Sequence, residues 1–460
     1  MWWIAIVAGL ALLAAACTSS GDEDEAASDD GGGTTTAAPA TTAPATTGGD
    51  GTEASSTTAP ADVELTASFR GVAADTITIG HTAIDFDTLN NDFGLDLAFQ
   101  DFRPQMDAIV AWYNENGGVL GRQIEVIHEV YLPVGATTAE EACLKLTEDN
   151  EVFAILNGFS GPGAEDVNEC ITEVHETVLV GGLPRADQAA AAQGRWVTDE
   201  MSLDRRSPAF VTLLDEAGVL GELGPIMVVG SNPDEEPIVR TMAEALREAG
   251  VEVPVETWIT TTGDETATRA EVEVFIEAAN NEGVTTVALV GEGELRNIAF
   301  FQNAPEFTYL MGNGDRITDW QSIPPEGLSA DTRILTNNNG PSPVGDPDVA
   351  ECIDVVEAAT GVEVIATEAL PEGDPNYWSG TIGACRRMAV FTQIAEAAGA
   401  ELTNDSWAAA LDQVPDLTVP GFEFVSLSSA KTDARDSLVL VEYDLDTLTF
   451  EPISAPVDVG

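Results

Sequence analysis

The stretch Phe99–Ile127, FQDFRPQMDAIVAWYNENGGVLGRQIEVI, decides the fold. Apolar residues recur in it at intervals of three and four, which predicts a helix with one apolar face; they are Phe99, Phe102, Met106, Ile109, Val110 and Tyr113. Pro104 suits the first helical turn, and Asn116-Gly117-Gly118 is a left-handed stop. From Gln123 to Glu129 the side chains alternate in the manner of a strand. The stretch therefore predicts a helix, a glycine turn and a strand.

A second strand, predicted at Asp75–Ile84 (DTITIGHTAI), precedes this stretch and completes a βαβ unit. The alternation continues along the chain. Further strands are predicted at 152–156, 177–180, 225–229, 251–258, 285–290 and 307–311, and helices at 163–175, 237–249 and 270–280. Repeated βα units form doubly wound parallel sheets, in which ligands bind outside the carboxyl ends of the strands. The sequence thus predicts an α/β protein with two such sheets.

The turn Asn114–Arg122 (NENGGVLGR), followed by an extended apolar run, resembles the first unit of type 1 periplasmic solute-binding proteins. The match is closest to the branched-chain amino acid and amide-binding (leucine-binding-protein-like) subgroup of ABC importers, and it extends over nearly all of the chain after residue 70. It implies two Rossmann-like lobes joined by a three-segment hinge, with lobe I at 72–195 and 333–435 and lobe II at 196–332 and 436–460. It also implies a hairpin in lobe II, formed by 438–442 and 448–452. Such lobes close around a ligand.

The N-terminus predicts export. Trp2–Ala16 is an apolar run too short for a comfortable membrane span, and it ends in small residues before Cys17. The sequence Leu13-Ala14-Ala15-Ala16-Cys17 resembles a lipobox, although the leucine stands one place early and no basic residue precedes the run. We expect a signal peptide over 1–17, lipidation of Cys17 and attachment to the outer face of the cytoplasmic membrane. A plain secretory signal with an incidental cysteine is the alternative.

Residues 18–70 are rich in Ser, Thr, Pro, Gly and acidic residues, a composition that cannot bury a core and predicts a disordered tether. The whole chain carries 79 acidic and 18 basic residues, for a net charge of −61. Such a charge repels nucleic acid and anionic lipid headgroups, so neither is expected as a partner. The acidity is typical of a protein in a saline medium, and equally of a high-GC codon bias.

Four cysteines remain once Cys17 is assigned to lipid: Cys143, Cys170, Cys352 and Cys385. An even set in an exported chain predicts disulfides. Sequential pairing is the simplest connectivity, but the sequence leaves the connectivity open. A metal site is not expected, because neither pair has the C-x-x-C spacing and the three histidines are scattered.

The candidate ligand-binding residues lie in loops that follow strands. In lobe I, the loop Asn157–Gly163 precedes a predicted helix, so Ser160 and Gly161 can hold a carboxylate; by resemblance, Ser160 matches the serine that binds an amino acid carboxylate. The alternative is a simple turn with a helix cap. Asp85 is a candidate for an ammonium group and Phe86 for an apolar wall, and Gly182 and Leu183 follow the next strand.

In lobe II, the corresponding candidates are Asn232, Asp234, Glu292, Asn313 and Asp315. The resemblance implies that a carboxylate at Asp315 holds the amino group of the ligand. Neither a dinucleotide fingerprint nor a nucleophile elbow is found, since Gly291-Glu292-Gly293 lacks the third glycine and Pro162 replaces a required glycine. We therefore expect no catalysis and no cofactor.

Together these features predict a lipid-anchored monomeric receptor. It would capture a small solute, such as an amino acid, an amide or a related carboxylate, and deliver it to the permease subunits of an ABC importer. The alternative is a surface sensor or co-receptor of the same fold that signals to a membrane partner.

Overall fold

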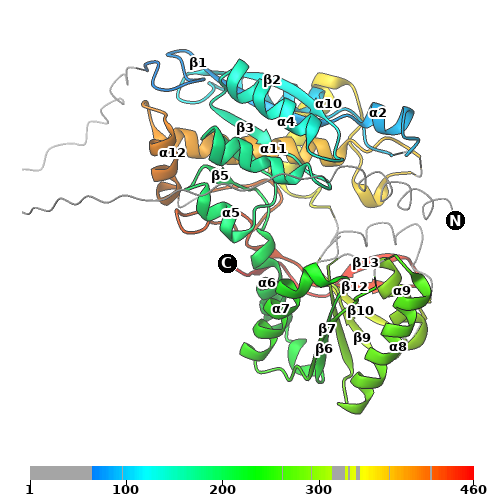
Figure 1. Cartoon of the computed structure of the whole chain (residues 1–460). Coiled ribbons are helices and arrows are strands. Elements are labelled where there is room, and N and C mark those ends of the chain that lie inside the picture. Colours follow the sequence, from blue (N-terminus) through cyan, green and yellow to red (C-terminus); the bar gives the residue numbers. More distant parts are fainter. Residues whose placement is uncertain are drawn as a thin grey trace, which may run out of the picture. The chain divides into compact units, whose positions relative to one another are not determined.

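The computed structural model describes residues 65–95, 97–261, 263–291, 293–312, 327–329, 332–337, 342–371, 373–414 and 417–460 (Figure 1). The predicted signal peptide, Cys17 and most of the predicted tether lie outside the described residues, as do Glu292, Asn313 and Asp315. No helix in the described ranges is long and apolar enough to cross a membrane.

The first sheet is parallel and has the order β2-β1-β3-β4-β5. Its strands are β1 (Thr76–Ile84), β2 (Gln123–Tyr131), β3 (Ala154–Asn157), β4 (Val178–Gly181) and β5 (Trp196–Val197). Along β3, Ala154 and Leu156 belong to one apolar core and Ile155 to another. Both faces of the sheet are therefore covered, which explains why the central strands β3 and β4 are almost continuously apolar.

Helices from distant parts of the chain cover the two faces. The core on one face includes side chains of α3 (Arg103–Glu115), α10 (Pro347–Thr360), α11 (Trp378–Ala398) and α12 (Asn404–Ala410). The core on the other face includes α4 (Thr137–Leu144) and the short helical turns that follow β3. Residues after 342 thus return to the first sheet, as Figure 1 shows for α10, α11 and α12.

The stretch Phe99–Ile127 forms the helix, the glycine turn and the strand that its spacing predicts, with one difference. Helix α3 begins only at Arg103, so Phe99 and Phe102 precede it and pack against Phe86 at ring distances of 5.4 and 5.3 Å. The glycine turn is a steric requirement: Gly118 has φ +61°, and a Cβ there would lie 1.9 Å from the carbonyl oxygen of Arg122.

Arg122, the residue that ends this turn, has a structural role. Its side chain is fully buried and donates hydrogen bonds to the carbonyl oxygens of Ala73, Thr66 and Ala400. The arginine therefore ties the turn to the start of β1 and to the end of α11, far away in the sequence. Burial lowers the pKa of Arg122.

The second sheet has the order β13-β12-β10-β9-β8-β6-β7. The strands are β6 (Ile226–Gly230), β7 (Val255–Trp258), β8 (Thr286–Val290), β9 (Thr308–Leu310), β10 (Arg333–Thr336), β12 (Val441–Asp444) and β13 (Thr449–Pro452). All pairs are parallel except those of the predicted hairpin, β12 with β10 and with β13. Because β10 pairs with β9, the chain stays in this sheet through Thr336, beyond the boundary at 332 that we expected.

Helices α6 (Leu203–Glu216) and α7 (Glu236–Glu248) share one core with this sheet, and α8 (Glu265–Asn281) and α9 (Glu294–Asn303) share the other. A small pair of strands, β11 (Ser437–Leu438) and β14 (Val457–Asp458), adds to the first of these cores through Leu438 and Val457. Shorter helices are α2 (Phe86–Asn91) and α5 (Ala186–Ala191).

Sequential pairing of the cysteines is confirmed: Cys143 bonds to Cys170, and Cys352 to Cys385. The segment predicted as a helix at 163–175 is helical over 165–174, but it does not form one regular α-helix. The segment forms a 3-10 turn at Glu165–Val167 and a π turn at Cys170–Val174. A physical reason lies at Asn168, whose buried amide bonds to both the N–H and the carbonyl oxygen of Phe159 and so anchors the segment to the preceding loop.

Candidate functional site

The loops that follow β2 and β3 meet at Tyr131 and Ser160. The tyrosine hydroxyl lies 3.1 Å from the Ser160 hydroxyl and accepts a hydrogen bond of 2.9 Å from the Ser160 N–H. Tyr131 is buried, whereas Ser160 is exposed. Burial raises the pKa of Tyr131, and the two bonds from Ser160 oppose this rise. The phenol therefore keeps its proton and can donate it to Ser160, which leaves the serine hydroxyl free to donate to a solute.

The chain around Ser160 is held in a fixed conformation. Gly158 and Gly161 have φ values of +73° and +97°. A Cβ at Gly161 would lie 2.4 Å from the carbonyl oxygen of Pro133, so only glycine lets the two loops approach this closely. The helical segment that follows this loop begins as a 3-10 turn at Glu165–Val167.

Arg387 of α11 is the basic residue that sequence reasoning missed. Its Nε lies 3.5 Å from a carboxylate oxygen of Asp199, is buried and has no hydrogen-bond partner among the described residues. Burial raises the pKa of Tyr131 and lowers that of His81, and the charge of Arg387 acts in the lowering direction on both groups. Burial raises the pKa of Asp199, and Arg387 opposes that rise. The available signal was an Arg-Arg pair in a chain with few basic residues.

A histidine pair lies on the same two strands. His81 and His128 are in register on β1 and β2, and their Nδ1 atoms are 3.0 Å apart. The Nε2 atom of His128 lies 2.9 Å from Asp107 of α3. Burial, then His128 and Arg387, lower the pKa of His81 to about 3. His81 is therefore neutral at physiological pH.

The other predicted residues of lobe I have partners of their own. The carboxylate of Asp85 accepts hydrogen bonds from the N–H and the hydroxyl of Thr88, and so caps α2. Phe86 lies in the aromatic cluster with Phe99 and Phe102. These contacts assign local structural roles to Asp85 and Phe86.

Gly182 and Leu183 follow β4. Gly182 has φ +68°, and its carbonyl oxygen accepts a hydrogen bond of 2.7 Å from Thr198. Leu183 is 38% exposed. This hydrogen bond from the Thr198 side chain holds the loop after β4 against the segment that leaves β5.

In the second sheet, Asn232 caps a 3-10 turn by accepting from the N–H of Asp234, whose side chain is exposed. The buried polar group at these strand ends is Arg296, which sequence reasoning missed. It donates to the carbonyl oxygens of Val229 and Val290 at 2.8 and 2.6 Å. Burial lowers the pKa of Arg296 to about 10. Arg296 therefore holds the carboxyl ends of β6 and β8 together.

Charged residues also tie together the segments at which the chain passes between the sheets. Thr198 and Asp433 pair in parallel, and Arg205 forms ion pairs with Asp433 at 2.5 Å and with Asp436 at 2.7 Å. Although burial favours the neutral acid, Ser202, Arg205 and Lys431 together lower the pKa of Asp433. These charges brace the segments near 200 and 433 predicted to form the hinge.

Glu200 joins two further arginines beside this pairing. It lies 3.2 Å from Arg386 and 2.9 Å from Arg435. Both guanidinium groups pack on the ring of Phe422, at 3.9 and 4.8 Å from its centroid. Burial raises the pKa of Glu200, but Arg435 and Arg386 outweigh it and hold the value at about 2.

The cluster formed by His175 and the Cys143–Cys170 disulfide is not a metal site. The ligand atoms of Cys143, Cys170 and His175 lie within 4.8 Å of one another. Because both sulfurs belong to the disulfide, neither offers a thiolate to a metal.

No protein-family model and no curated protein sequence matches the chain. Solved structures do. A solute-binding protein of an ABC transporter from Rhodopseudomonas palustris HaA2, in complex with p-hydroxybenzoic acid, has a TM-score of 0.57 at 12% identity, over 84% of this chain and 98% of the other. An ABC transporter substrate-binding protein from Desulfitobacterium hafniense in complex with Leu has a TM-score of 0.55 at 14% identity, over 82% and 100%.

A leucine-binding protein from Thermotoga maritima MSB8 has a TM-score of 0.55 at 14% identity, over 83% of this chain and 98% of the other. At such low identity the likeness establishes the fold. The chain therefore has the type 1 periplasmic binding protein fold, which it shares with solute-binding proteins of ABC transporters.

Proposed function

We propose that the protein captures a small carboxylate-bearing solute at the strand ends of the first sheet and delivers it to the permease of an ABC importer. The observation that carries this proposal is Arg387, a half-buried cation of α11 that lies 3.5 Å from Asp199 and whose charge opposes the rise in the pKa of Tyr131, in a chain of net charge −61. Its Nε has no hydrogen-bond partner among the described residues. Amino acids and related carboxylates are the solutes that such a site selects.

The chemistry of capture follows from three residues. The buried Tyr131 donates to Ser160, the Ser160 hydroxyl donates to one carboxylate oxygen, and Arg387 supplies the opposite charge. Closure of lobes around the solute would exclude water and strengthen each of these bonds. The neighbours crystallised with p-hydroxybenzoic acid and with Leu bind carboxylic acids, which supports this class of solute.

A thermal-shift and calorimetric screen tests the proposal. The probes are leucine, 4-hydroxybenzoate and leucinamide, the last of which lacks the carboxylate. A solute at 100 times its dissociation constant stabilises the protein by about 2.7 kcal/mol. We expect stabilisation by a carboxylate and its loss in Arg387→Gln and Ser160→Ala.

Arg240→Gln is the matched control. It removes the same charge from an exposed site on α7, where Arg240 pairs only with Glu236, so binding should be unchanged. If leucinamide stabilises the protein as well as leucine does, or if Arg387→Gln binds normally, the carboxylate site is wrong. Binding without uptake of the solute by cells that carry the cognate permease would instead favour the sensor role.

The anchor is part of the same proposal. Lipidation of Cys17 would hold the receptor at the outer face of the membrane, and the chain over 18–70 would give it reach. Mass spectrometry of the N-terminal peptide should find a diacylglyceryl group on Cys17, and Cys17→Ser should release the protein into the medium. An unmodified mature N-terminus at another residue would contradict the anchor.

A further inference from the structure

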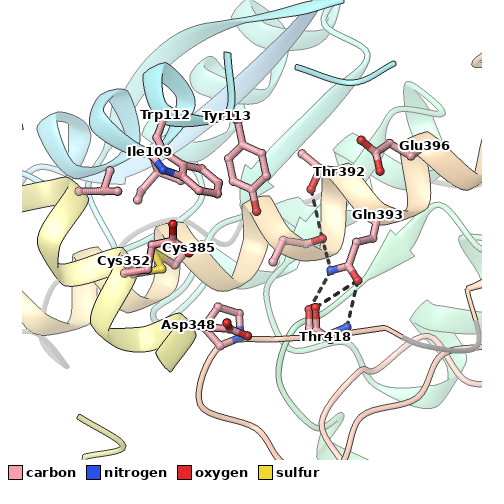
Figure 2. Close-up of a pocket in the computed structure, with 14 residues that line it drawn as sticks. Ile109, Trp112, Tyr113, Asp348, Cys352, Cys385, Thr392, Gln393, Glu396 and Thr418 are labelled. Atoms are coloured by element: carbon pink, nitrogen blue, oxygen red, sulfur yellow. Dashed lines mark hydrogen bonds between the residues drawn. A yellow bond between two sulfur atoms is a disulfide. The ribbon is translucent and has the colours of Figure 1, made fainter. Parts of the chain in front are cut away.

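A cavity of about 360 Å³ lies in the first lobe, away from the strand-end site (Figure 2). Its walls come from α3, α10 and α11 and from the segment at Thr418 and Pro420. These helices cover one face of the first sheet, so the cavity opens among helices, whereas Ser160 lies in the loop that follows β3. None of the proposed carboxylate-binding residues lines it.

The lining of this cavity has an apolar part and an aromatic part. We call its apolar lining residues, Ile109, Val355 and the Cys352–Cys385 disulfide, the floor. Trp112 and Tyr113 stand side by side in Figure 2, with ring centroids 4.9 Å apart and planes at 90°. Both rings are half-buried and offer surface to a bound molecule.

Three carboxylates also line the cavity: Asp348, Glu351 and Glu396. Within the described part of the chain, none of their side chains has a hydrogen bond or an ion pair. Burial raises the pKa of Tyr113, Thr392 opposes the rise, and the charges of Glu396, Glu351 and Asp348 then add to it. The three acids therefore create a negative field at the tyrosine hydroxyl, and no Lys or Arg lines the cavity to offset it.

The walls are fixed in place before any ligand arrives. The Cys352–Cys385 disulfide joins α10 to α11. The side-chain amide of Gln393 donates a hydrogen bond of 2.8 Å to the carbonyl oxygen of Thr418 and accepts one of 3.0 Å from the Thr418 N–H. These two bonds hold the segment at Thr418 and Pro420 against α11. A preformed cavity loses little conformational entropy on binding.

We propose that this cavity is a second binding site, for a small organic cation that carries an ammonium group on an apolar body. The volume suits a small molecule. The floor buries the apolar part, Trp112 and Tyr113 attract the cation by cation–π interaction, and the unpaired carboxylates neutralise its charge. A carboxylate solute is excluded by the same three acids, so the two sites select opposite charges.

The test is calorimetric titration of the full chain with 2-phenylethylammonium, its neutral analogue 2-phenylethanol and the anion 3-phenylpropionate. We expect the ammonium compound to bind at least tenfold more tightly than the alcohol, and the anion not to bind. The variant Asp348→Asn/Glu351→Gln/Glu396→Gln should weaken ammonium binding at least tenfold. Trp112→Ala should weaken it as well, with Trp112→Phe in between.

A matched control separates the cavity from the general acidity of the protein. Glu216→Gln/Glu248→Gln/Glu282→Gln removes the same three charges from exposed positions in the second lobe and should leave the dissociation constant unchanged. Equal weakening by both triple variants, equal binding of the alcohol, or no binding of 2-phenylethylammonium to the folded protein would each overturn the proposal. Circular dichroism and the melting temperature of each variant establish that it is folded.

Discussion

His81 and His128 face each other across neighbouring parallel strands, with their Nδ1 atoms 3.0 Å apart. Asp107 lies 2.9 Å from Nε2 of His128 and favours a proton on that nitrogen. With the proton on Nε2, the Nδ1 of His128 accepts a bond from His81. A buried imidazole that donates in this way stays neutral, which agrees with the pKa of about 3 for His81.

This pair makes the stability of the protein depend on pH. Because the pKa of His81 is lower in the folded state than its usual 6.5, the unfolded state binds more protons below that pH. His81 therefore contributes stability that is complete above pH 6.5 and is lost as the pH falls toward 3, by up to about 1.4 kcal/mol per pH unit. Asp101, Arg103 and Arg387 also act on this group.

Urea unfolding of the wild type and of His81→Asn between pH 7.5 and 4 measures this effect. The variant keeps a donor near His128 but cannot be protonated, so its free energy of unfolding should change less with pH in this range. Equal slopes for the two proteins would show that other groups cause the loss.

Glu200 stabilises the protein by holding two arginines. Glu200→Gln leaves Arg386 and Arg435 close together without their shared carboxylate, which should cost about 2 kcal/mol at pH 7, since the group is partly exposed. The pKa of Glu200 is lowered to about 2, so its contribution is complete above its usual value of 4.5 and is lost as the pH falls through about 2. The difference between variant and wild type should therefore shrink from pH 7 to pH 3.

Guanidinium unfolding at these two pH values provides the measurement. Glu236→Gln is a suitable control, because Glu236 forms an exposed pair with Arg240, and no measurable loss is expected. A variant of Glu200 that is as stable as this control would contradict the role assigned to the cluster.

Arg296→Lys should destabilise the second sheet by about 3 kcal/mol. Lysine cannot reproduce the planar donor set that bonds to Val229, Val290 and Gly291, and at least two buried carbonyl oxygens would lose a partner. Arg247→Lys, at a half-exposed arginine of α7, should have little effect. Chemical unfolding followed by tryptophan fluorescence distinguishes the two, and equal stabilities would argue against a bracing role for Arg296.

Tyr131→Phe should weaken solute binding without unfolding the protein. The phenyl ring keeps the contact of Tyr131 with Phe159, at 5.0 Å between ring centroids, but it cannot orient the Ser160 hydroxyl. We expect about a tenfold rise in the dissociation constant, the size of one lost hydrogen bond. Calorimetry with the solute found in the screen checks this, and a dissociation constant equal to that of the wild type would remove Tyr131 from the site.

Local signals in the sequence determined the elements and the fold class. The apolar spacing in Phe99–Ile127 set α3 and β2, and Gly118 was needed because any Cβ there would meet the backbone of Arg122. Two pairs of cysteines, close in sequence on neighbouring elements, matched the disulfides that form. Such signals act over a few residues and are therefore readable in the chain itself.

The tertiary structure alone decided which polar residues come together. Arg387 and Asp199 are 188 positions apart and pair only because α11 returns to the first sheet. Asp85 was a candidate ligand residue by position, and the fold adds that both of its carboxylate oxygens accept hydrogen bonds from Thr88. The return of the chain after Thr336 was likewise set by pairing of β10 with β9. Contacts of this kind depend on packing between distant segments, for which periodicity and spacing carry no information.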